Sequence, residues 1–384
     1  MKILIPGMDG YIGWSLAIHQ LSKGNEICGF DNFSRREHVK EMNSHSIVPI
    51  LSMKERIDVL KNEFGDKISF FEGDLLNSEF TDSIMKDFQP NVIVHLAEQP
   101  SAPYSMIDQE HNVYTQQNNV IGNLNLIHSI KRHTPNAHLI KLGTMGEYGY
   151  DPGLEIPEGF YETEFRGKKA RVPFPRLAGS WYHWTKVHDS NNIMFACKLW
   201  GMKSTDIMQG IVYGTKIDGM KDDTHNTRFD IDEAFGTVIN RFCAQSVIGH
   251  PLTVHGKGGQ TRGFLSLNDS IQCISLLIDN PPKDGEYRVV NQFDQQFSVL
   301  KLAKMIQSIG NDLGLNVEIK NKENPREEAE EHYYKADHKI LFDLGFQRTR
   351  EIEDEIKIML EQLIKYKKRI EDKKDVIVKN IKWK

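Results

Sequence analysis

The sequence predicts an α/β protein: a doubly wound parallel sheet with helices on both faces, joined to a smaller α/β domain. Two observations predict the sheet. As far as residue 211, short apolar runs alternate with amphipathic stretches, which is typical of parallel strands linked by right-handed helical crossovers. A glycine-rich turn also follows the first apolar run, and an aspartate ends the second, as in Rossmann-type dinucleotide-binding domains.

Each predicted element has the pattern of its type. The strands are short runs of apolar and β-branched residues, and the helices carry apolar residues at intervals of three and four. The predicted strands are 2–6, 26–30, 68–71, 91–96 and 138–142. The predicted helices are 11–21, 79–88, 113–132 and 180–200.

The chain is long enough for two domains. After residue 211 the alternation becomes irregular, and glycines and prolines gather in 249–263. Residues 264–279 then have the pattern of a strand and a helix, which we expect to return to the first domain. The expected division is a Rossmann-type domain of residues 1–211 plus 264–284, and a second domain of residues 212–263 plus 285–384.

The composition limits the classes of partner. Of 384 residues, 39% are hydrophobic and 26% are charged, and the formal net charge of -5 lacks the basic excess of a duplex-binding protein. No apolar run approaches the roughly 20 residues of a membrane-spanning helix. The four cysteines form no CxxC pair. We expect no signal or transit segment before the first strand. We expect a protein of the reducing cytoplasm, with neither a nucleic-acid nor a membrane partner.

The glycine-rich turn has the spacing GxxGxxG, with Gly7, Gly10 and Gly13. Glycines let the backbone turn tightly and approach a pyrophosphate, while the following helix presents free N–H groups and the positive end of its dipole. Glycines also end ordinary turns, so the spacing alone is weak. Its place between the first strand and the first helix favours a dinucleotide site.

Asp31 closes the second predicted strand. A carboxylate there can accept the hydroxyls of an adenosine ribose and repel a 2′-phosphate, which favours NAD over NADP. Arg35 and Arg36 oppose this preference, because arginines near the ribose can bind a 2′-phosphate. If they are ordinary exposed loop residues, they have no effect on the choice of cofactor. Asp74, after the third strand, can meet the adenine amino group or simply belong to a turn.

Tyr182 and Lys186 form a YxxxK pair, whose members share one face of a helix. We expect the ammonium of Lys186 to lower the pKa of Tyr182, so that the tyrosine can take a proton from a hydroxyl as hydride leaves the carbon. Thr144 follows the strand 138–142 and completes a Thr–Tyr–Lys trio, although it could also be an ordinary loop hydroxyl.

These features and several longer stretches resemble the UDP-sulfoquinovose synthases, a branch of the extended short-chain dehydrogenases/reductases in the NAD-dependent epimerase/dehydratase superfamily. The similarity runs nearly from end to end. Its most specific stretches are 101–108, 141–149, 182–183, 249–263, 291–293, 324–326 and 331–334. Sugar-nucleotide epimerases and 4,6-dehydratases share the glycine loop and the YxxxK pair but not these stretches.

The resemblance implies which residues bind each ligand, and it makes the second domain a nucleotide-sugar-binding domain. Those implied for NAD are Gly7, Asp9, Gly10, Tyr11, Ile12, Gly13, Asp31, Asn32, Arg35, Asp74, Leu75, Leu96, Asn119, Tyr182 and Lys186. Those implied for the UDP-sugar are Ser101, Tyr104, Thr144, Met145, Gln209, Arg241, Thr253, His255, Gln260, Thr261, Arg262 and Arg326. A guanidinium binds phosphate through two hydrogen bonds, so Arg262 is a candidate diphosphate contact; Arg326 is another, or an ordinary surface residue.

The resemblance also implies a reaction, in which UDP-glucose and sulfite become UDP-sulfoquinovose with bound NAD. The route is oxidation at C4, loss of water across C5 and C6, addition of sulfite at C6 and return of hydride to C4. A C4 ketone makes the C5 hydrogen acidic, so a base is needed. The candidates are His183 and Glu147, either of which could instead be a supporting hydrogen-bond partner.

Two departures from related enzymes bear on this route. The Asp-Glu pair that follows the threonine in 4,6-dehydratases is Met145-Gly146 here, which argues against an ordinary dehydratase. Pro100 stands where the plant-type enzymes carry an arginine beside the substrate, and their plastid-targeting extension is missing. One basic contact is therefore lost or supplied elsewhere.

Two alternatives stay open on the sequence. One is a UDP-sugar 4-epimerase or 4,6-dehydratase, and the other is a catalytically silent NAD-binding scaffold or RNA-associated relative, since a fold does not fix an activity. The intact trio argues against the second. His255 and His332 belong to no metal-ligand set, so we expect no metal. The family implies a homodimer through helices 113–132 and 180–200. The sequence identifies neither the sulfite donor nor the lipid or glycan acceptor.

Overall fold

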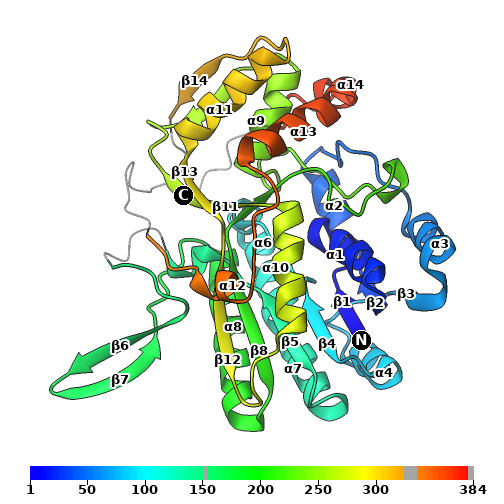
Figure 1. Cartoon of the computed structure of the whole chain (residues 1–384), viewed down its shortest axis with the longest axis vertical. Coiled ribbons are helices and arrows are strands. Elements are labelled where there is room, and N and C mark those ends of the chain that lie inside the picture. Colours follow the sequence, from blue (N-terminus) through cyan, green and yellow to red (C-terminus); the bar gives the residue numbers. More distant parts are fainter. Residues whose placement is uncertain (150–153, 324–334, 379–384) are drawn as a thin grey trace.

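The computed structural model describes residues 1–149, 154–323 and 335–378. A seven-stranded parallel sheet forms the centre of this part of the chain (Figure 1). In sheet order its strands are β12 (Tyr287–Gln292), β8 (Lys203–Gln209), β5 (His138–Leu142), β4 (Val92–His95), β1 (Lys2–Pro6), β2 (Glu26–Asp31) and β3 (Ile68–Glu72). The five predicted strands are confirmed. The strand order reverses between β1 and β4, the point at which open α/β sheets bind ligands.

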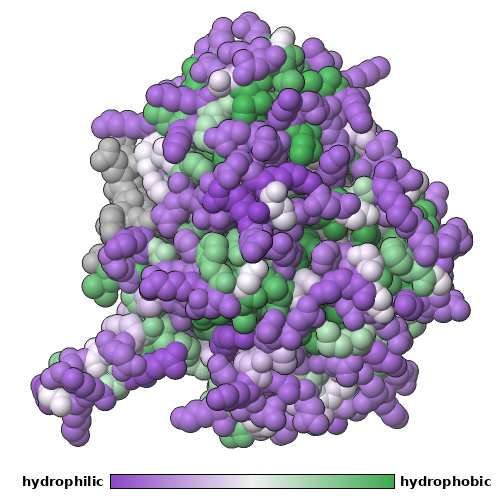
Figure 2. Space-filling view, in the orientation of Figure 1, coloured by the Kyte–Doolittle hydropathy of each residue, from purple (hydrophilic) through white to green (hydrophobic). Residues whose placement is uncertain are grey.

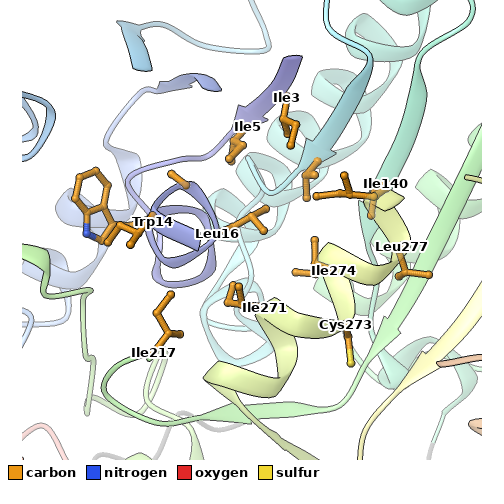
Figure 3. Packing of buried hydrophobic residues seen from close by; sticks show 14 of the residues in the cluster. Ile3, Ile5, Trp14, Leu16, Ile140, Ile217, Ile271, Cys273, Ile274 and Leu277 are labelled. Atoms are coloured by element: carbon orange, nitrogen blue, oxygen red, sulfur yellow. The ribbon is translucent and has the colours of Figure 1, made fainter. Parts of the chain in front are cut away.

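Successive residues of β1 bury into two different cores, because side chains alternate between the faces of a strand. Ile3 and Ile5 pack with the first group of helices, as Figure 3 shows, and Leu4 packs with the second group. The first group is α1 (Tyr11–Ser22), α3 (Met53–Phe64) and α10 (Leu267–Asp279). The second is α4 (Ser78–Phe88), α7 (Gly122–His133) and α8 (Trp181–Trp200). Both faces of the sheet are therefore covered, as the predicted fold requires.

The helix predicted over 113–132 is not one regular helix. It consists of α6 (Gln109–Gln116), a π-helical turn (Gln117–Ile121) and α7. Periodicity of apolar residues does not detect a single wider turn, and such turns are frequent at functional sites. The predicted helix over 180–200 is confirmed as α8, with the Ser180 side chain capping its first turn.

A second core lies above the sheet in Figure 1, around α9 (Val238–Val247), α11 (Val299–Asp312) and α13 (Ile352–Ile364). It includes two small sheets. One contains β9 (Ile211–Tyr213), β11 (Thr261–Ser266) and β13 (Gln295–Ser298), and the other pairs β10 (Leu252–His255) with β14 (Ile319–Lys322).

The predicted domain boundaries need two corrections, although the division itself stays a prediction. Helix α10 does return to the first core, but β11, at the start of the 264–284 segment, pairs with β9 and β13 instead. Strand β12, assigned to the second domain, pairs along its length with β8 in the large sheet. After residue 211 the chain passes between the two cores several times. The irregular spacing of apolar residues there does not indicate which core each strand joins.

A β-hairpin that the sequence did not predict, β6 (Phe160–Phe165) and β7 (Lys168–Pro173), projects from the body of the molecule (Figure 1). Figure 2 shows mainly hydrophilic side chains along it and over most of the visible face. The remaining helices are α2 (Ser34–Glu41), α5 (Ala102–Ser105), α12 (Lys339–Asp343) and α14 (Lys367–Glu371). Within the described residues, no helix combines the length and the apolar character needed to span a bilayer.

Candidate active site

The glycine loop joins β1 to α1 at the carboxyl edge of the sheet. Gly7 has a φ of 86°, and a Cβ there would lie 2.5 Å from the backbone carbon of Leu96. A Cβ on Gly13 would lie 2.3 Å from the carbonyl oxygen of Gly7. Gly10 caps α1 without a side chain, so the first N–H groups of the helix face outward from the loop. Only glycines permit this close approach of three backbone segments.

Asp31 lies beside this loop, because Pro6 pairs with Phe30 across β1 and β2. Its carboxylate accepts hydrogen bonds from the backbone N–H of Asp9 (3.0 Å) and of Phe33 (2.8 Å). Burial, and then the charge of Asp9, raise the pKa of Asp31 to about 6. The carboxylate is thus fixed in direction, and it titrates close to neutral pH.

The two arginines that opposed an NAD preference are occupied by carboxylates. Arg36 donates two hydrogen bonds of 2.6 Å to Asp9, and Arg35 lies 2.8 Å from Asp230. The charge of each guanidinium is thus already balanced by a carboxylate, and Asp31 would repel a 2′-phosphate. The structure therefore supports NAD over NADP.

The affinity for NAD is expected to fall as the pH drops through about 6. Asp31 is ionised above its raised pKa of about 6, and a ribose diol donates best to the ionised carboxylate. One pH unit below that pKa, about one-tenth of the cofactor-free protein is ionised, so affinity should be roughly tenfold weaker. Calorimetric titration of cofactor-stripped protein at pH 8 and pH 5 measures this. Asp31→Asn should bind weakly at both pH values, and an equal pH dependence in that variant would contradict the assignment.

A cavity of about 410 Å³ extends from the glycine loop to the start of α8. Most of the residues predicted for NAD and chemistry line it, together with Ser101 and Gln209, which were predicted for the UDP-sugar. They are Gly7, Asp9, Gly10, Tyr11, Ile12, Gly13, Asp31, Asn32, Arg35, Asp74, Leu75, Leu96, Ser101, Thr144, Tyr182, His183, Lys186 and Gln209. Residues far apart in sequence thus share one cavity at the carboxyl edge of the sheet.

The Thr–Tyr–Lys trio lies at one end of this cavity. Tyr182 and Lys186 come from the first turns of α8, with the Lys186 Nζ 5.8 Å from the centre of the tyrosine ring. Thr144 caps the turn that follows β5, and its hydroxyl accepts the backbone N–H of Gly146 at 3.1 Å. The trio has the side chains that proton transfer at a sugar hydroxyl requires.

The expected effect of Lys186 on Tyr182 is wrong for the protein without ligands. Burial, and then the charge of Glu98, hold the pKa of Tyr182 above its ordinary value. Lys186 does not lower it as expected, because its ammonium forms an ion pair with Glu98 and also donates to the carbonyl of Leu142 (2.6 Å). Glu98 lines the cavity, and the sequence analysis missed it.

His183 lies next to the trio on α8. Its ring centre is 5.0 Å from that of Tyr182, and its Nδ1 lies 2.9 Å from the Ser180 hydroxyl. A Cβ on Gly146 would lie only 2.3 Å from His183 Nε2. The absence of a side chain at 146, where 4,6-dehydratases carry an acid, leaves the space that the imidazole occupies.

Glu147 is not placed to act on a substrate, which corrects its assignment as a candidate base. Its side chain is fully buried, and it does not line the cavity. It lies 3.1 Å from Lys141 Nζ and 2.7 Å from Arg176, and it accepts from the Ser190 hydroxyl at 2.9 Å. The place of Glu147 shortly after Thr144 in the sequence is compatible with either a catalytic base or a buried ion-pair partner.

Replacing Glu147 with glutamine is therefore expected to destabilise the fold. Loss of the carboxylate leaves Lys141 and Arg176 partly uncompensated, and breaking a buried ion pair costs about 3–5 kcal/mol. Urea unfolding measures the change. The matched control is Glu164→Gln on the exposed hairpin, where a change within about 0.5 kcal/mol is expected. Equal stability of the two variants would contradict a structural role for Glu147.

Asn119 is buried behind the cavity, which corrects its assignment as a direct cofactor contact. Its side chain accepts from Gln99 N–H (2.8 Å) and donates to the Thr185 hydroxyl (2.9 Å). The neighbouring Asn118 lines the cavity instead. Both are buried in the π-helical turn, which shifts the register of the helix and explains why the adjacent residue is the one that lines the cavity.

Several residues predicted for the UDP-sugar also lie outside the cavity lining. Tyr104 is buried and donates to Glu41 (2.7 Å), and Met145 is buried in a hydrophobic cluster. The others outside the lining are Arg241, Thr253, His255, Gln260, Thr261 and Arg262. These come from α9, β10, β11 and the turn before β11 in the second core. Arg326 and His332 lie outside the described residues.

Residues 228–240 contribute to the cavity without having been predicted. Arg228, Asp230, Phe235, Thr237 and Asn240 line it. Arg228 lies 3.1 Å from Asp230, the same carboxylate that holds Arg35. Buried Phe229 and Ile231 alternate with these charges, a pattern that could have indicated an extended segment with one polar face.

Comparison with known proteins assigns the fold and this site to a family. The family model described as "NAD dependent epimerase/dehydratase family" matches residues 3–291. The chain is 49% identical to a UDP-sulfoquinovose synthase of Sulfolobus acidocaldarius, over 100% of this chain and 98% of the relative. It is 46% identical to the chloroplastic UDP-sulfoquinovose synthase of Spinacia oleracea, over 100% of this chain and 79% of the relative.

Solved structures agree in fold. A UDP-glucose 4-epimerase from Thermotoga maritima has a TM-score of 0.72 at 19% identity, covering 95% of this chain and 99% of that one. A UDP-glucuronic acid 4-epimerase from Bacillus cereus, in complex with NAD, has a TM-score of 0.71 at 19% identity, covering 96% and 100%. At these identities the likeness concerns the fold alone.

The sheet, the glycine loop and the Thr–Tyr–Lys trio define an NAD-using enzyme, and the chain belongs to the NAD-dependent epimerase/dehydratase family. Within that family it belongs to the UDP-sulfoquinovose synthases. The family assignment also confirms NAD as the predicted cofactor. The 4-epimerases are only distant relatives.

Proposed function

We propose that the enzyme converts UDP-glucose and sulfite to UDP-sulfoquinovose and water. The observation that carries the proposal is the common cavity of the glycine loop, the Thr–Tyr–Lys trio and His183. Such an arrangement suits a sugar that is oxidised at C4, loses water across C5 and C6, adds sulfite at C6 and is reduced again at C4. Bound NAD accepts the hydride from C4 and returns it.

Tyr182 and Thr144 act at the C4 oxygen. The Tyr182 Oη takes the C4 hydroxyl proton during oxidation and returns it during reduction, while the Thr144 hydroxyl orients the same oxygen by a hydrogen bond. Lys186 acts on Tyr182 through its charge. Because proton and hydride are both returned to C4, the enzyme consumes no external oxidant.

His183 moves the C5 proton. The imidazole is adjacent to Tyr182, so one bound sugar can meet both side chains, and histidine gains and loses protons near neutral pH. Glu147, the other candidate, is sequestered by Lys141 and Arg176. The structure thus favours His183 between the two.

Sulfite must reach C6 as an anion. Pro100 lines the cavity, so the arginine of the plant-type enzymes has no counterpart at that position. In the described part of the chain the lysines and arginines of the lining are Arg35, Arg228 and Lys186, each in an ion pair. Each of these cations is already matched by a carboxylate, so the basic contact of the plant-type enzymes has no replacement among the described lining residues.

Mass spectrometry of the products tests the function. Purified protein is incubated with UDP-glucose, with and without sulfite. The proposal expects UDP-sulfoquinovose only when sulfite is present. Conversion to UDP-galactose or to a stable 4-keto-6-deoxy sugar, unaffected by sulfite, would support an epimerase or a dehydratase instead.

We also propose a homodimer through α6, α7 and α8. Large apolar side chains are exposed on α6, on α8 and in the π-helical turn that joins α6 to α7: Val113, Ile121, Trp181, Phe195 and Leu199. Such a face on adjacent helices is suited to association with a second copy. Phe195→Glu should convert the dimer to a monomer in sedimentation analysis. An unchanged mass would contradict the assignment of this face.

The proposed location is the cytoplasm. All four cysteines, Cys28, Cys197, Cys243 and Cys273, are buried free thiols, which suits a reducing compartment. Cell fractionation of the source organism, with a tagged chain, tests this.

A further inference from the structure

The ammonium of Lys186 is held by two oxygen groups. Its Nζ donates to the carbonyl of Leu142 at 2.6 Å and pairs with the carboxylate of Glu98. The side chains of Lys186 and Glu98 are only 5% and 3% exposed. In a site with little water, this pair is screened far less than a surface ion pair. The charge of Lys186 is therefore largely cancelled where it could act on Tyr182.

His95 does not compete with Lys186 for Glu98. Its Nε2 lies 3.3 Å from the other carboxylate oxygen, but burial lowers the pKa of His95 to about 4. The imidazole is thus neutral at the pH of a working enzyme. Lys186 is the cation that balances Glu98.

A wider network of buried titratable groups surrounds this pair. Its members come from four elements: His95 on β4, Lys141 on β5, Asp206 on β8, and Lys186 and Asp189 on α8. Glu147 and Arg176 complete it, on the turn after β5 and the loop before α8. Register brings its strand members together, since Lys141 pairs with His95 on one side and with Asp206 on the other.

Burial favours the neutral form of Asp189, which would leave the ionised groups of this network balanced. Burial, and then the charge of Glu98, raise the pKa of Asp189 well above its ordinary value, and neither of its oxygens has a hydrogen-bond partner in the described part of the chain. The carboxylates of Glu98, Glu147 and Asp206 then balance the cations Lys141, Lys186 and Arg176. Glu98 is the carboxylate of this set that lines the cavity.

We propose that Glu98 is a positioning residue that acts through Lys186 to keep Tyr182 as a neutral phenol whenever the site lacks an additional positive charge. This inference rests on the proposed function and deepens it. NAD, when bound, would supply a positive charge in its oxidised form and none there in its reduced form. Tyr182 would therefore release its proton more readily before oxidation at C4, and after it would keep the proton taken from the C4 hydroxyl.

A neutral Tyr182 serves the step at C5. While the sugar is a C4 ketone, the phenol O–H donates to the C4 oxygen. Removal of the C5 proton by His183 moves negative charge onto that oxygen, and a donor placed there stabilises the developing charge. A phenolate would repel it. Glu98 thereby links the redox trio to the elimination.

Ultraviolet titration of the tyrosinate of Tyr182 tests the proposal. The full chain is used, with the signal of Tyr182→Phe subtracted to isolate the one side chain. The wild-type protein, loaded with reduced cofactor, should show no ionisation of Tyr182 below the ordinary phenol value of about 10. In Glu98→Gln the midpoint should fall by roughly one pH unit or more, because Lys186 then acts uncompensated.

Two further variants separate charge from burial. Glu98→Asp keeps the carboxylate and should titrate like the wild type. Asp189→Asn removes a buried carboxyl whose raised pKa favours the neutral form, so the midpoint of Tyr182 should move far less in this variant than in Glu98→Gln. An equal shift in Asp189→Asn, or none in Glu98→Gln, would overturn the proposal.

The wild-type midpoint tests the proposal even if Glu98→Gln does not fold. Ionisation of Tyr182 well below the ordinary phenol value would show Lys186 acting alone, which contradicts the proposal. The titration uses neither UDP-glucose nor sulfite. The titration can therefore contradict the role of Glu98 while product formation is observed, and it can support that role while no product forms. The two proposals are thus tested separately.

Discussion

Replacing Tyr182 with phenylalanine should reduce turnover of UDP-glucose by about 100-fold to 10,000-fold, the usual range for loss of a general acid or base. The variant keeps the ring that packs at the start of α8 and loses only the hydroxyl. No other side chain is assigned to take the C4 hydroxyl proton, so oxidation at C4 has no efficient path. Chromatographic measurement of product, with sulfite present, gives the rate.

Binding of UDP-glucose should survive in the same variant, because the assigned contacts to the diphosphate lie elsewhere. The matched control is Tyr104→Phe, another buried tyrosine, which loses only its hydrogen bond to Glu41 and should keep nearly normal turnover. Near-normal turnover in Tyr182→Phe would show that the redox site is assigned wrongly. A large loss in Tyr104→Phe would restore Tyr104 as a substrate contact.

Sequence reasoning succeeded where local spacing determines geometry. Gly7 to Gly13 must form a tight turn wherever a strand meets a helix, and Tyr182 and Lys186 must share a helix face. The role of Asp31 could be predicted because the residue ends a predicted strand next to the glycine loop. Each of these signals lies within a few residues, so no tertiary knowledge was required, and the fold class followed from the alternation that surrounds them.

Sequence reasoning failed where a partner comes from a distant segment. Arg35 and Asp230 are 195 positions apart, and no local pattern shows that the carboxylate occupies the arginine. Glu147 was assigned as a base from its position after Thr144, but Lys141 and Arg176 decide its role. Glu98 was missed for the same reason, because its effect on the site depends on its ion pair with Lys186.

The boundary errors have a related cause. Strand β12 joins the large sheet only through its pairing with β8, after the chain has already visited the second core. Apolar pattern identifies a strand but not its neighbour in space. The π-helical turn at Asn119 is a smaller case, because one extra residue in a turn changes which side chain faces the cavity.

Turnover in heavy water should place deuterium at C5 of the product and none at C4. In the proposed route the C4 hydrogen leaves as hydride and returns from the same bound cofactor. The C5 hydrogen leaves as a proton to His183, which exchanges with solvent, and C5 must take a proton back after sulfite adds at C6. Direct displacement of the C6 hydroxyl by sulfite, or simple 4-epimerisation, would leave both positions unlabelled. Nuclear magnetic resonance of the product distinguishes these outcomes.

Replacing His183 with glutamine should slow deuterium exchange at C5 by about 100-fold to 10,000-fold while UDP-glucose still reduces the bound cofactor. The two readouts separate because Tyr182 serves C4 and His183 serves C5. The matched control is His188→Gln, an exposed histidine on the same helix, which should change neither. Equal loss of cofactor reduction and of exchange in His183→Gln would indicate that the imidazole only supports Tyr182. Exchange that persists at the wild-type rate would require another base, and with Glu147 sequestered by Lys141 and Arg176, it would have to come from the solvent-facing part of the cavity.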